Sequence, residues 1–287
     1  MAPSMLKITL AFLSGTRSNS GMKKWTFFFF FGVLACGEAM VVPNYTIAEQ
    51  APTGLDWSYV YHYKNSSSVA VAQYWILTAA HVADDGGTGA LSIDGTTYNQ
   101  QEIVFHDTAD LALVRYDKAL PGFFDMYTGD VVPKNKNSPR YSVLMVGFGC
   151  VGTASTSSWT DSGSGKGTKR WGSQEIDRTE TFNYNAGGGN TSNAGFWMDF
   201  DLENTDYEAG VGIGDSGGGT FINDGGTWKL AGINTARIGS GEDYTSNFSI
   251  SMPDYSVWIS ETVPEPMAAS LIVLFGSGML MIKRIFV

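Results

Sequence analysis

Three short segments of the chain carry side chains that could cooperate in nucleophilic catalysis. His81 follows a strand-like apolar run and is preceded by two alanines. Asp110 opens the apolar run 111–114, and Ser216 lies in a glycine-rich turn. A serine hydroxyl is a poor nucleophile until a base removes its proton, and that base needs a third group that fixes its tautomer. The three segments therefore predict a nucleophile, a general base and an orienting carboxylate.

Each of these residues, taken singly, also has an ordinary structural interpretation as a packing or turn residue. The chain holds 3 histidines, and we compared their settings. His62 lies inside an aromatic run and is expected to pack or face solvent, while His106 lacks small neighbours. Only His81 has the setting that a general base needs. Asp107 is the competing orienting acid, but the Leu-Ala-Leu-Val run that follows Asp110 does not follow it.

The elements that would position these residues are short strands bounded by turn residues. Strands are predicted at 57–63, 69–72, 74–78, 91–98, 111–116, 141–147, 219–223 and 227–234. One helix is predicted at 254–263, whereas 117–139 and 152–195 are predicted to be loops, the second around a strand near 169–177. Many short strands and one late helix predict an all-β barrel or sandwich.

The segments TAAH, DLAL and GDSGG, in that order, resemble the trypsin-like serine peptidase family over about residues 55–260. The resemblance implies two antiparallel six-stranded β-barrels with the site between them and a short C-terminal helix. It also implies that His81 is the general base and then acid, that Asp110 orients it, and that Ser216 forms an acyl-enzyme. Protein or peptide substrates are expected, with no cofactor and no metal.

The same resemblance assigns roles to the turn around the serine. The backbone N–H groups of Gly214 and Ser216 would form an oxyanion hole. Asp215 would support the site, normally by pairing with a freed N-terminal amine. No Ile-Val-Gly-Gly start is present near residue 40, so Asp215 needs another cation or hydrogen-bond donors. Arg170 and Arg178 are the candidate cations.

The specificity pocket is expected at Gly210, Thr235, Ala236 and Arg237. Gly210 stands where trypsin carries the carboxylate that selects Lys and Arg, and it offers no charge. Arg237 would narrow the entrance and repel basic side chains. Small apolar residues are therefore the expected preference, with acidic ones second, although Arg237 could instead point to solvent and select nothing. Glu208 would need a loop shift to replace the missing carboxylate.

Cysteines and charge exclude several classes of protein. Val82 and Gly212 stand where digestive enzymes carry disulfide cysteines, and the chain has 2 cysteines in all. Only Cys150 would remain after signal removal, so no internal disulfide and no structural zinc site are expected. The net charge is −10 for the whole chain, and residues 40–263 hold 12 basic and 26 acidic residues, a net charge of −14. This charge argues against binding of nucleic acid or an anionic membrane by the folded domain.

Residues 1–39 are predicted to be a leader and signal peptide. Met22 precedes two lysines and the apolar run 25–35, and small residues favour cleavage by signal peptidase after Ala39. A lipobox ending at Cys36 is the alternative. Because the signal begins at Met22, residues 1–21 are expected to be an upstream start that is not used. We expect export from the cell.

Residues 264–287 form a separate C-terminal tail, which leaves 40–263 as the protease domain. Pro264-Glu265-Pro266, the apolar run 267–282 and a basic end resemble the PEP-CTERM sorting signal of Gram-negative bacteria. The run would span roughly 24 Å as a helix, short of a ~30 Å hydrocarbon core. The resemblance implies processing by exosortase and delivery to the cell surface or outside, with membrane contact only through this tail. An ordinary membrane anchor is the alternative.

Two other functions fit parts of the pattern. A non-catalytic binding module on the trypsin-like fold would keep the architecture without the chemistry. An α/β-hydrolase esterase would place the histidine last in the chain and its serine between a strand and a helix. Here the histidine comes first, so the order of the residues argues against the esterase.

Overall fold

The computed structural model describes residues 40–131, 142–187, 189–202 and 207–263. The predicted signal peptide (1–39) and sorting tail (264–287) lie outside the described residues. Within the described ranges, no helix is both long and apolar enough to cross a membrane.

The N-terminal half forms an antiparallel sheet in the order β1-β2-β3-β7-β6. Its strands are β1 (Val60–Tyr63), β2 (Ser66–Ala72), β3 (Trp75–Thr78), β6 (Gln100–Phe105) and β7 (Ala112–Tyr116). A separate hairpin joins β4 (Leu91–Ile93) to β5 (Thr96–Tyr98) through Asp94 and Gly95, both at positive φ. A two-residue hairpin turn requires that backbone conformation. The 3₁₀ turn η1 (Trp57–Tyr59) precedes β1, and the short helix α2 (Ala80–Asp84) begins just after β3.

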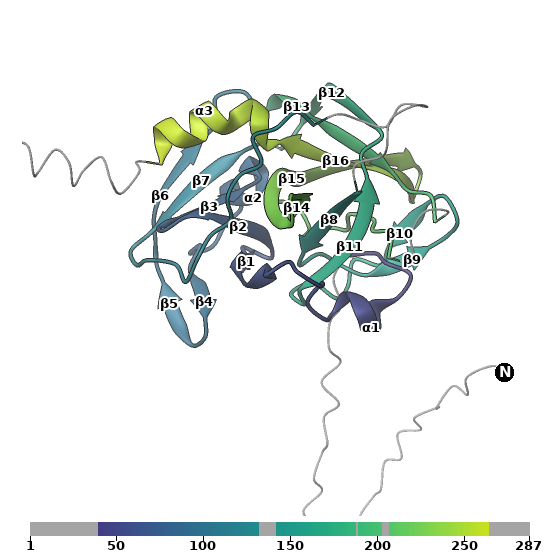
Figure 1. Ribbon diagram of the computed structural model, residues 1–287, viewed down its shortest axis with the longest axis horizontal. Helices are drawn as coiled ribbons and strands as arrows, with labels where there is room; N and C mark the ends of the chain where they lie inside the picture. The colour runs from purple at the N-terminus through teal and green to yellow at the C-terminus, as the bar shows by residue number, and fades with distance from the viewer. Residues whose placement is uncertain (1–39, 132–141, 188, 203–206, 264–287) are drawn as a thin grey trace, which may run out of the picture. The chain divides into compact units, whose positions relative to one another are not determined.

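The C-terminal half forms a larger sheet with nine strands, and Figure 1 shows its green strands beside the blue strands of the first sheet. Its strands are β8 (Ser142–Gly147), β9 (Gly152–Ala154), β10 (Trp159–Asp161), β11 (Arg170–Glu175), β12 (Arg178–Asn185), β13 (Asn190–Asp199), β14 (Gly219–Asp224), β15 (Thr227–Ser240) and β16 (Asp243–Ser251). Helix α1 (Tyr45–Ala48) lies near the start, and α3 (Met252–Thr262) follows β16.

One apolar core contains buried residues of both sheets and of α3. Leu77 and Leu113 come from the first sheet, Val146 and Phe221 from the second, and Ile259 from the helix. Because burial of apolar area is the main favourable term in folding, this shared core holds the two halves of the domain together. The candidate catalytic residues lie beside these strands: His81 in α2 just after β3, Asp110 just before β7 and Ser216 just before β14.

The predicted all-β class and the C-terminal helix are confirmed. The strands divide as five and nine, with β4–β5 apart, because two hairpins, β9–β10 and β12–β13, enlarge the second sheet. The prediction that 152–195 is mainly loop was wrong, although its strand near 169–177 is present as β11. Alternate residues of β12 are exposed and polar, so this edge hairpin lacks the apolar signal of a core strand.

The first described residues belong to the core. Met40 and Val41 are fully buried. The N–H of Val41 donates to the carbonyl of Gly210 at 3.0 Å, and the N–H of Gly210 donates back at 2.8 Å. This pair of hydrogen bonds fixes the chain that leads to the glycine-rich turn.

Candidate active site

His81 and Asp110 are joined by two hydrogen bonds. The His81 N–H donates to Asp110 Oδ1 at 2.9 Å, and the ring Nδ1 lies 2.7 Å from Asp110 Oδ2. Asp110 is 0% exposed, so its carboxylate is removed from water and acts as an acceptor for the ring. A proton on Nδ1 leaves Nε2 free to accept one, which is the tautomer that a general base needs. The pairing predicted between these two residues is present.

The loop that carries Asp110 is held by the β12–β13 hairpin of the other half. The backbone N–H of Asp110 donates to Asn193 Oδ1 at 2.7 Å, and the Tyr184 hydroxyl donates to Asp110 Oδ2 at 2.8 Å. On its other side, His106 Nδ1 accepts the N–H of Ala109 at 2.9 Å. His106 therefore supports the loop, and neither it nor Asp107 replaces a member of the predicted triad.

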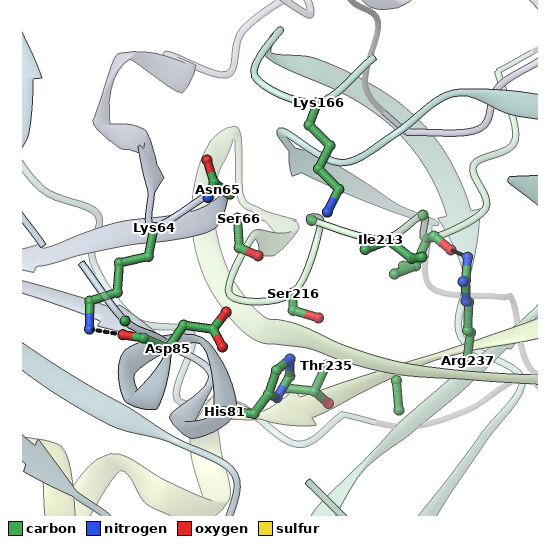
Figure 2. Close-up of a pocket in the computed structure, with 15 residues that line it drawn as sticks. Lys64, Asn65, Ser66, His81, Asp85, Lys166, Ile213, Ser216, Thr235 and Arg237 are labelled. Carbon is green, nitrogen blue, oxygen red and sulfur yellow. Dashed lines mark hydrogen bonds between the residues drawn. The ribbon is translucent and has the colours of Figure 1, made fainter. Parts of the chain in front are cut away.

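Ser216 lies in a turn that is supported from β2. The N–H of Ser67 donates to the carbonyl of Ser216 at 3.0 Å. The buried Ser67 hydroxyl donates to the carbonyl of Gly214 at 2.9 Å and accepts the N–H of Phe148 at the same distance. Ser216 and His81 line one pocket of about 500 Å³, and Figure 2 shows the serine beside the imidazole. The pocket thus brings the candidate nucleophile to the candidate base.

The peptide groups beside Ser216 suit an oxyanion hole. Across the described ranges, the N–H groups of Gly214 and Ser216 donate no hydrogen bond, and both residues line the pocket. Gly214 has φ +103°, a conformation that a side chain at Cα would strain. Two free donors beside a nucleophile can stabilise the negative oxygen of a tetrahedral intermediate.

Asp215 is fully buried behind the turn and is supported by backbone donors. The N–H of Gly149 donates to its Oδ1 at 2.7 Å, and the N–H of Gly212 donates to its Oδ2 at 2.8 Å. Burial raises the pKa of Asp215 to about 7, against the lowering effect of these hydrogen bonds. The hydrogen-bond donors predicted as one alternative for Asp215 are present.

The two candidate cations for Asp215 bind other carboxylates. Arg170 is buried, forms an ion pair with Glu49 and stacks over the Tyr45 ring at 5.3 Å. Arg178 forms an ion pair with Asp199 at 2.9 Å. Both arginines thus form ion pairs with other carboxylates, while the charges of Arg237 and Arg170 act to lower the pKa of Asp215.

The predicted specificity residues are only partly brought together. Thr235, Ala236 and Arg237 line the pocket with Ser216, whereas Gly210 is not among its lining residues. A Cβ at Gly210 would lie 2.4 Å from the ring of Trp159, which is itself buried. The buried indole of Trp159 thus fills the space beside Gly210, and neither residue lines the pocket.

Arg237 is held against the pocket wall, and its side chain is only 15% exposed. Its guanidinium donates to the carbonyl of Val211 at 2.9 Å, forms an ion pair with Asp161 and lies 3.7 Å from the centre of the Tyr244 ring. Figure 2 shows the side chain reaching across to the segment that precedes Ser216. The alternative in which Arg237 points freely to solvent is not what the structure has.

Glu208 lies outside the pocket. Its Oε1 accepts the N–H of Asp201 and lies 3.3 Å from Gln174 Nε2. Burial raises its pKa to about 7. It does not take the place of the missing selecting carboxylate.

Sequence reasoning missed Ser67, Asp161, Tyr184 and Asn193. Each acts through a contact with a residue 70 or more positions away in the chain, or with a residue whose orientation no local pattern specifies. The sequence indicated only that the expected buried carboxylate of Asp215 needs partners, and the two glycines of the run 147–149 allow a close approach of the backbone to it. No comparable signal points to Tyr184.

The candidate site coincides with a known family. The family model described as Trypsin matches residues 46–259, which include His81, Asp110 and Ser216. The chain belongs to the trypsin family. A search of the curated proteins found no match to this trypsin-family chain.

The search of solved structures gave matches of low sequence identity, including one with a TM-score above 0.5. The inactive form of the Rv3671c protease has a TM-score of 0.51 and 13% identity, over 77% of this chain and 96% of the other. The active form of that M. tuberculosis protease has a TM-score of 0.47 and 12% sequence identity, over 67% of this chain and 70% of the other. The passenger domain of the plasmid-encoded toxin of enteroaggregative Escherichia coli has a TM-score of 0.47 and 18% sequence identity, over 68% of this chain and 21% of the other.

Proposed function

We propose that the protein is an active serine endopeptidase. The observation that carries the proposal is the hydrogen-bonded His81–Asp110 pair at the wall of the pocket that holds Ser216 and two unpaired N–H groups. Membership of the trypsin family supports a hydrolase of the serine-protease type. The proposal adds the triad, the acyl-enzyme and the peptide substrate.

In the proposed reaction, His81 Nε2 removes the proton of Ser216 as Oγ attacks the peptide carbonyl. The oxygen then carries negative charge, and the N–H groups of Gly214 and Ser216 stabilise it. His81 gives the proton to the leaving amine, so an acyl-enzyme forms at Ser216. Water, activated by the same imidazole, hydrolyses the ester and restores the serine. Asp110 stabilises the imidazolium at each step.

A fluorophosphonate probe tests this chemistry directly, because it reacts with an activated serine without requiring the right peptide. The expected result is labelling of the wild-type domain, located at Ser216 by peptide mass mapping. Ser216→Ala should abolish labelling, and Thr220→Ser, a change at a buried hydroxyl on β14, should keep it. Failure of the folded wild-type protein to react would support a non-catalytic binding module instead.

The proposed specificity is cleavage after small apolar residues. Gly210 offers no carboxylate and is packed against Trp159, and Arg237 is hydrogen-bonded to Val211 at the pocket wall, which supports a preference for short side chains. The site is also cationic. Lys166 is exposed, lines the pocket and, within the described residues, has no ion-pair or hydrogen-bond partner. Lys and Arg substrates would meet like charge in a partly desolvated site.

A peptide library digested by residues 40–263 tests the specificity. We expect Ala or Val before the cleaved bond, with acidic residues second and Lys and Arg disfavoured. Arg237→Gly should broaden the profile to larger side chains. Arg115→Gln should not, because Arg115 forms an exposed ion pair on β7 and does not line the pocket. A wild-type profile dominated by Lys or Arg would overturn this assignment of the pocket.

We also propose export and surface delivery, on the basis of the signal-like and PEP-CTERM-like ends. Both ends lie outside the described residues. A chain that ends at Val263 should be soluble and active but released instead of retained at the surface. Cell fractionation of the full-length and shortened proteins measures this. Inactivity of the shortened protein beside an active full-length one would show that the tail is needed for the fold.

A further inference from the structure

The carboxylate of Asp110 receives a hydrogen bond that the mechanism above does not use. The Tyr184 hydroxyl donates to Asp110 Oδ2 at 2.8 Å, and the same oxygen lies 2.7 Å from His81 Nδ1. The third donor, the His81 N–H, goes to Oδ1. The oxygen that faces the imidazole therefore has two partners, and only one of them is the histidine.

We propose that Tyr184 is a positioning residue of the triad, whose hydroxyl orients the Asp110 carboxylate toward His81 and shares its negative charge. This inference rests on the proposed function, because it assigns a role within that reaction. Tyr184 acts through Asp110 and makes no step of the chemistry itself.

The hairpin that carries Tyr184 is built to hold this loop. Asn193, on the partner strand β13, is fully buried and accepts the backbone N–H of Asp110 at 2.7 Å. Its amide nitrogen donates to the carbonyl of Phe182 and to the Thr191 hydroxyl. The hairpin thus hydrogen-bonds to the backbone of Asp110 through Asn193 and to its carboxylate through Tyr184. These two contacts together fix the tyrosine hydroxyl relative to the carboxylate.

The hairpin also contacts the loop through its backbone. The N–H of Ser192 donates to the carbonyl of Thr108 at 2.8 Å. This contact lies two residues before Asp110 and needs no particular side chain. Loss of the Tyr184 hydroxyl alone would therefore leave the hairpin in place, which makes its effect separable from folding.

The phenol remains a donor over the working pH range. Burial raises the pKa of Tyr184 well above its ordinary value, and the charge of Asp110 raises it further. A neutral phenol beside a carboxylate can only donate its proton toward it. Hydrogen bonds to charged groups are stronger than neutral ones, so the contact constrains the carboxylate more than an ordinary packing contact would.

The test is Tyr184→Phe, which removes one oxygen and keeps the ring. We expect the rate of reaction with a small fluorophosphonate to fall about tenfold to a hundredfold, since a hydrogen bond to a charged group is typically worth that factor. The small probe does not depend on peptide binding. The acid limb of the rate against pH should move to higher pH, because an unshared carboxylate charge favours the protonated imidazole.

The matched control is Tyr255→Phe. The Tyr255 hydroxyl accepts the N–H of Ala194 on the same hairpin at 2.9 Å and does not reach Asp110. It should lower the melting temperature without moving the acid limb. The other titratable or charged groups that line the pockets beside His81 are Lys64, Asp84, Asp85, His106, Asp107, Lys166 and Arg237. They are identical in both variants, so a difference between the pH profiles reports on the hydroxyl.

A second measurement does not need turnover. The low-field proton resonance of the His81 Nδ1–H reports the hydrogen bond to Asp110, and it can be recorded in a Ser216→Ala background. Tyr184→Phe should shift it and Tyr255→Phe should not. If the wild type were inert to the probe but this resonance shifted, the proposed function would fail while the positioning role stood. An unchanged rate, acid limb and resonance in folded Tyr184→Phe would overturn the inference.

Discussion

Two fully buried aspartates flank the candidate site, and the fold satisfies them in different ways. Asp110 accepts hydrogen bonds from the imidazole and backbone of His81 and from the Tyr184 hydroxyl. These donors come from both halves of the domain. Asp215 accepts from the backbone N–H groups of Gly149 and Gly212, which are parts of the chain that no substitution removes without moving the backbone.

The difference shows what each carboxyl group is suited to do. Asp110 is connected to a group that can gain a proton, so its charge can assist a reaction. The hydrogen bonds described for Asp215 come from backbone N–H groups, and its burial raises its pKa to about 7. It serves as an acceptor that holds the turn around Ser216.

The largest expected effect is that of Asp110→Asn. An amide can donate to Nδ1 and thus stabilise the wrong tautomer, so kcat should fall about 10⁴-fold with the fold intact. Hydrolysis of a peptide substrate and thermal unfolding measure the two properties. Asp215→Asn should instead lower both, because one of its two backbone donors would face an N–H group. Near-normal turnover by Asp110→Asn would remove the distinction between the two aspartates.

Gly149→Ala tests the close backbone approach to Asp215. The added Cβ would lie 2.4 Å from the Asp215 carboxylate and 2.7 Å from its backbone nitrogen. Backbone must move to relieve that clash, so a loss of more than about 3 kcal/mol in the free energy of unfolding is expected. Urea denaturation measures it. Gly86→Ala is the control, since nothing lies within 4 Å of its added Cβ; an equal effect of the two changes would contradict the prediction.

Asn193→Ala tests the grip on the backbone of Asp110. The buried N–H of Asp110 would lose its acceptor, which should cost about 1–3 kcal/mol, and turnover should fall as the loop shifts. Asn183→Ala, at an exposed position of the same hairpin, should change neither quantity. Denaturation and turnover of both variants decide the matter. If Asn193→Ala kept full stability, the hairpin would not be what holds the loop.

The sequence predicted what short motifs can encode. His81, Asp110 and Ser216 stand in local patterns whose residue types reveal their chemistry, and the structure brings the first two into hydrogen-bond contact. The all-β class followed from strand and turn signals, such as the Asp94-Gly95 hairpin. These features depend on residues close together in the chain.

Contacts made across the fold were not predictable in this way. Tyr184 lies in a polar segment whose composition favours loops, and its contact with Asp110 depends on the register of β12 with β13. Arg237 was recognised as a pocket residue, but its ion pair with Asp161 depends on the position of β10 beside β16. No alternation or motif specifies either pairing. The partners of a buried charge are determined by tertiary packing.

The smallest effect concerns pH and sharpens the account of Asp215 by means of a second buried acid, Glu208. Burial raises the pKa of Glu208 to about 7, so the folded chain keeps a proton there that the unfolded chain releases above its ordinary value near pH 4. The folded state then binds more protons between about pH 4 and 7, so this contribution to stability is full below that range and is lost as pH rises through about 7. Each such proton changes the free energy of unfolding by at most about 1.4 kcal/mol per pH unit.

His62 and His106, whose pKa values burial lowers, contribute the opposite slope, so the informative quantity is the difference between two variants in how stability changes with pH. In urea denaturation at pH 5 and pH 8, Glu208→Gln should lose less stability than the wild type on raising the pH, or gain more. Glu242→Gln, at an exposed turn, should follow the wild type. If Glu208→Gln did so as well, burial would not be holding a proton on this carboxyl, and the same explanation for Asp215 would lose its support.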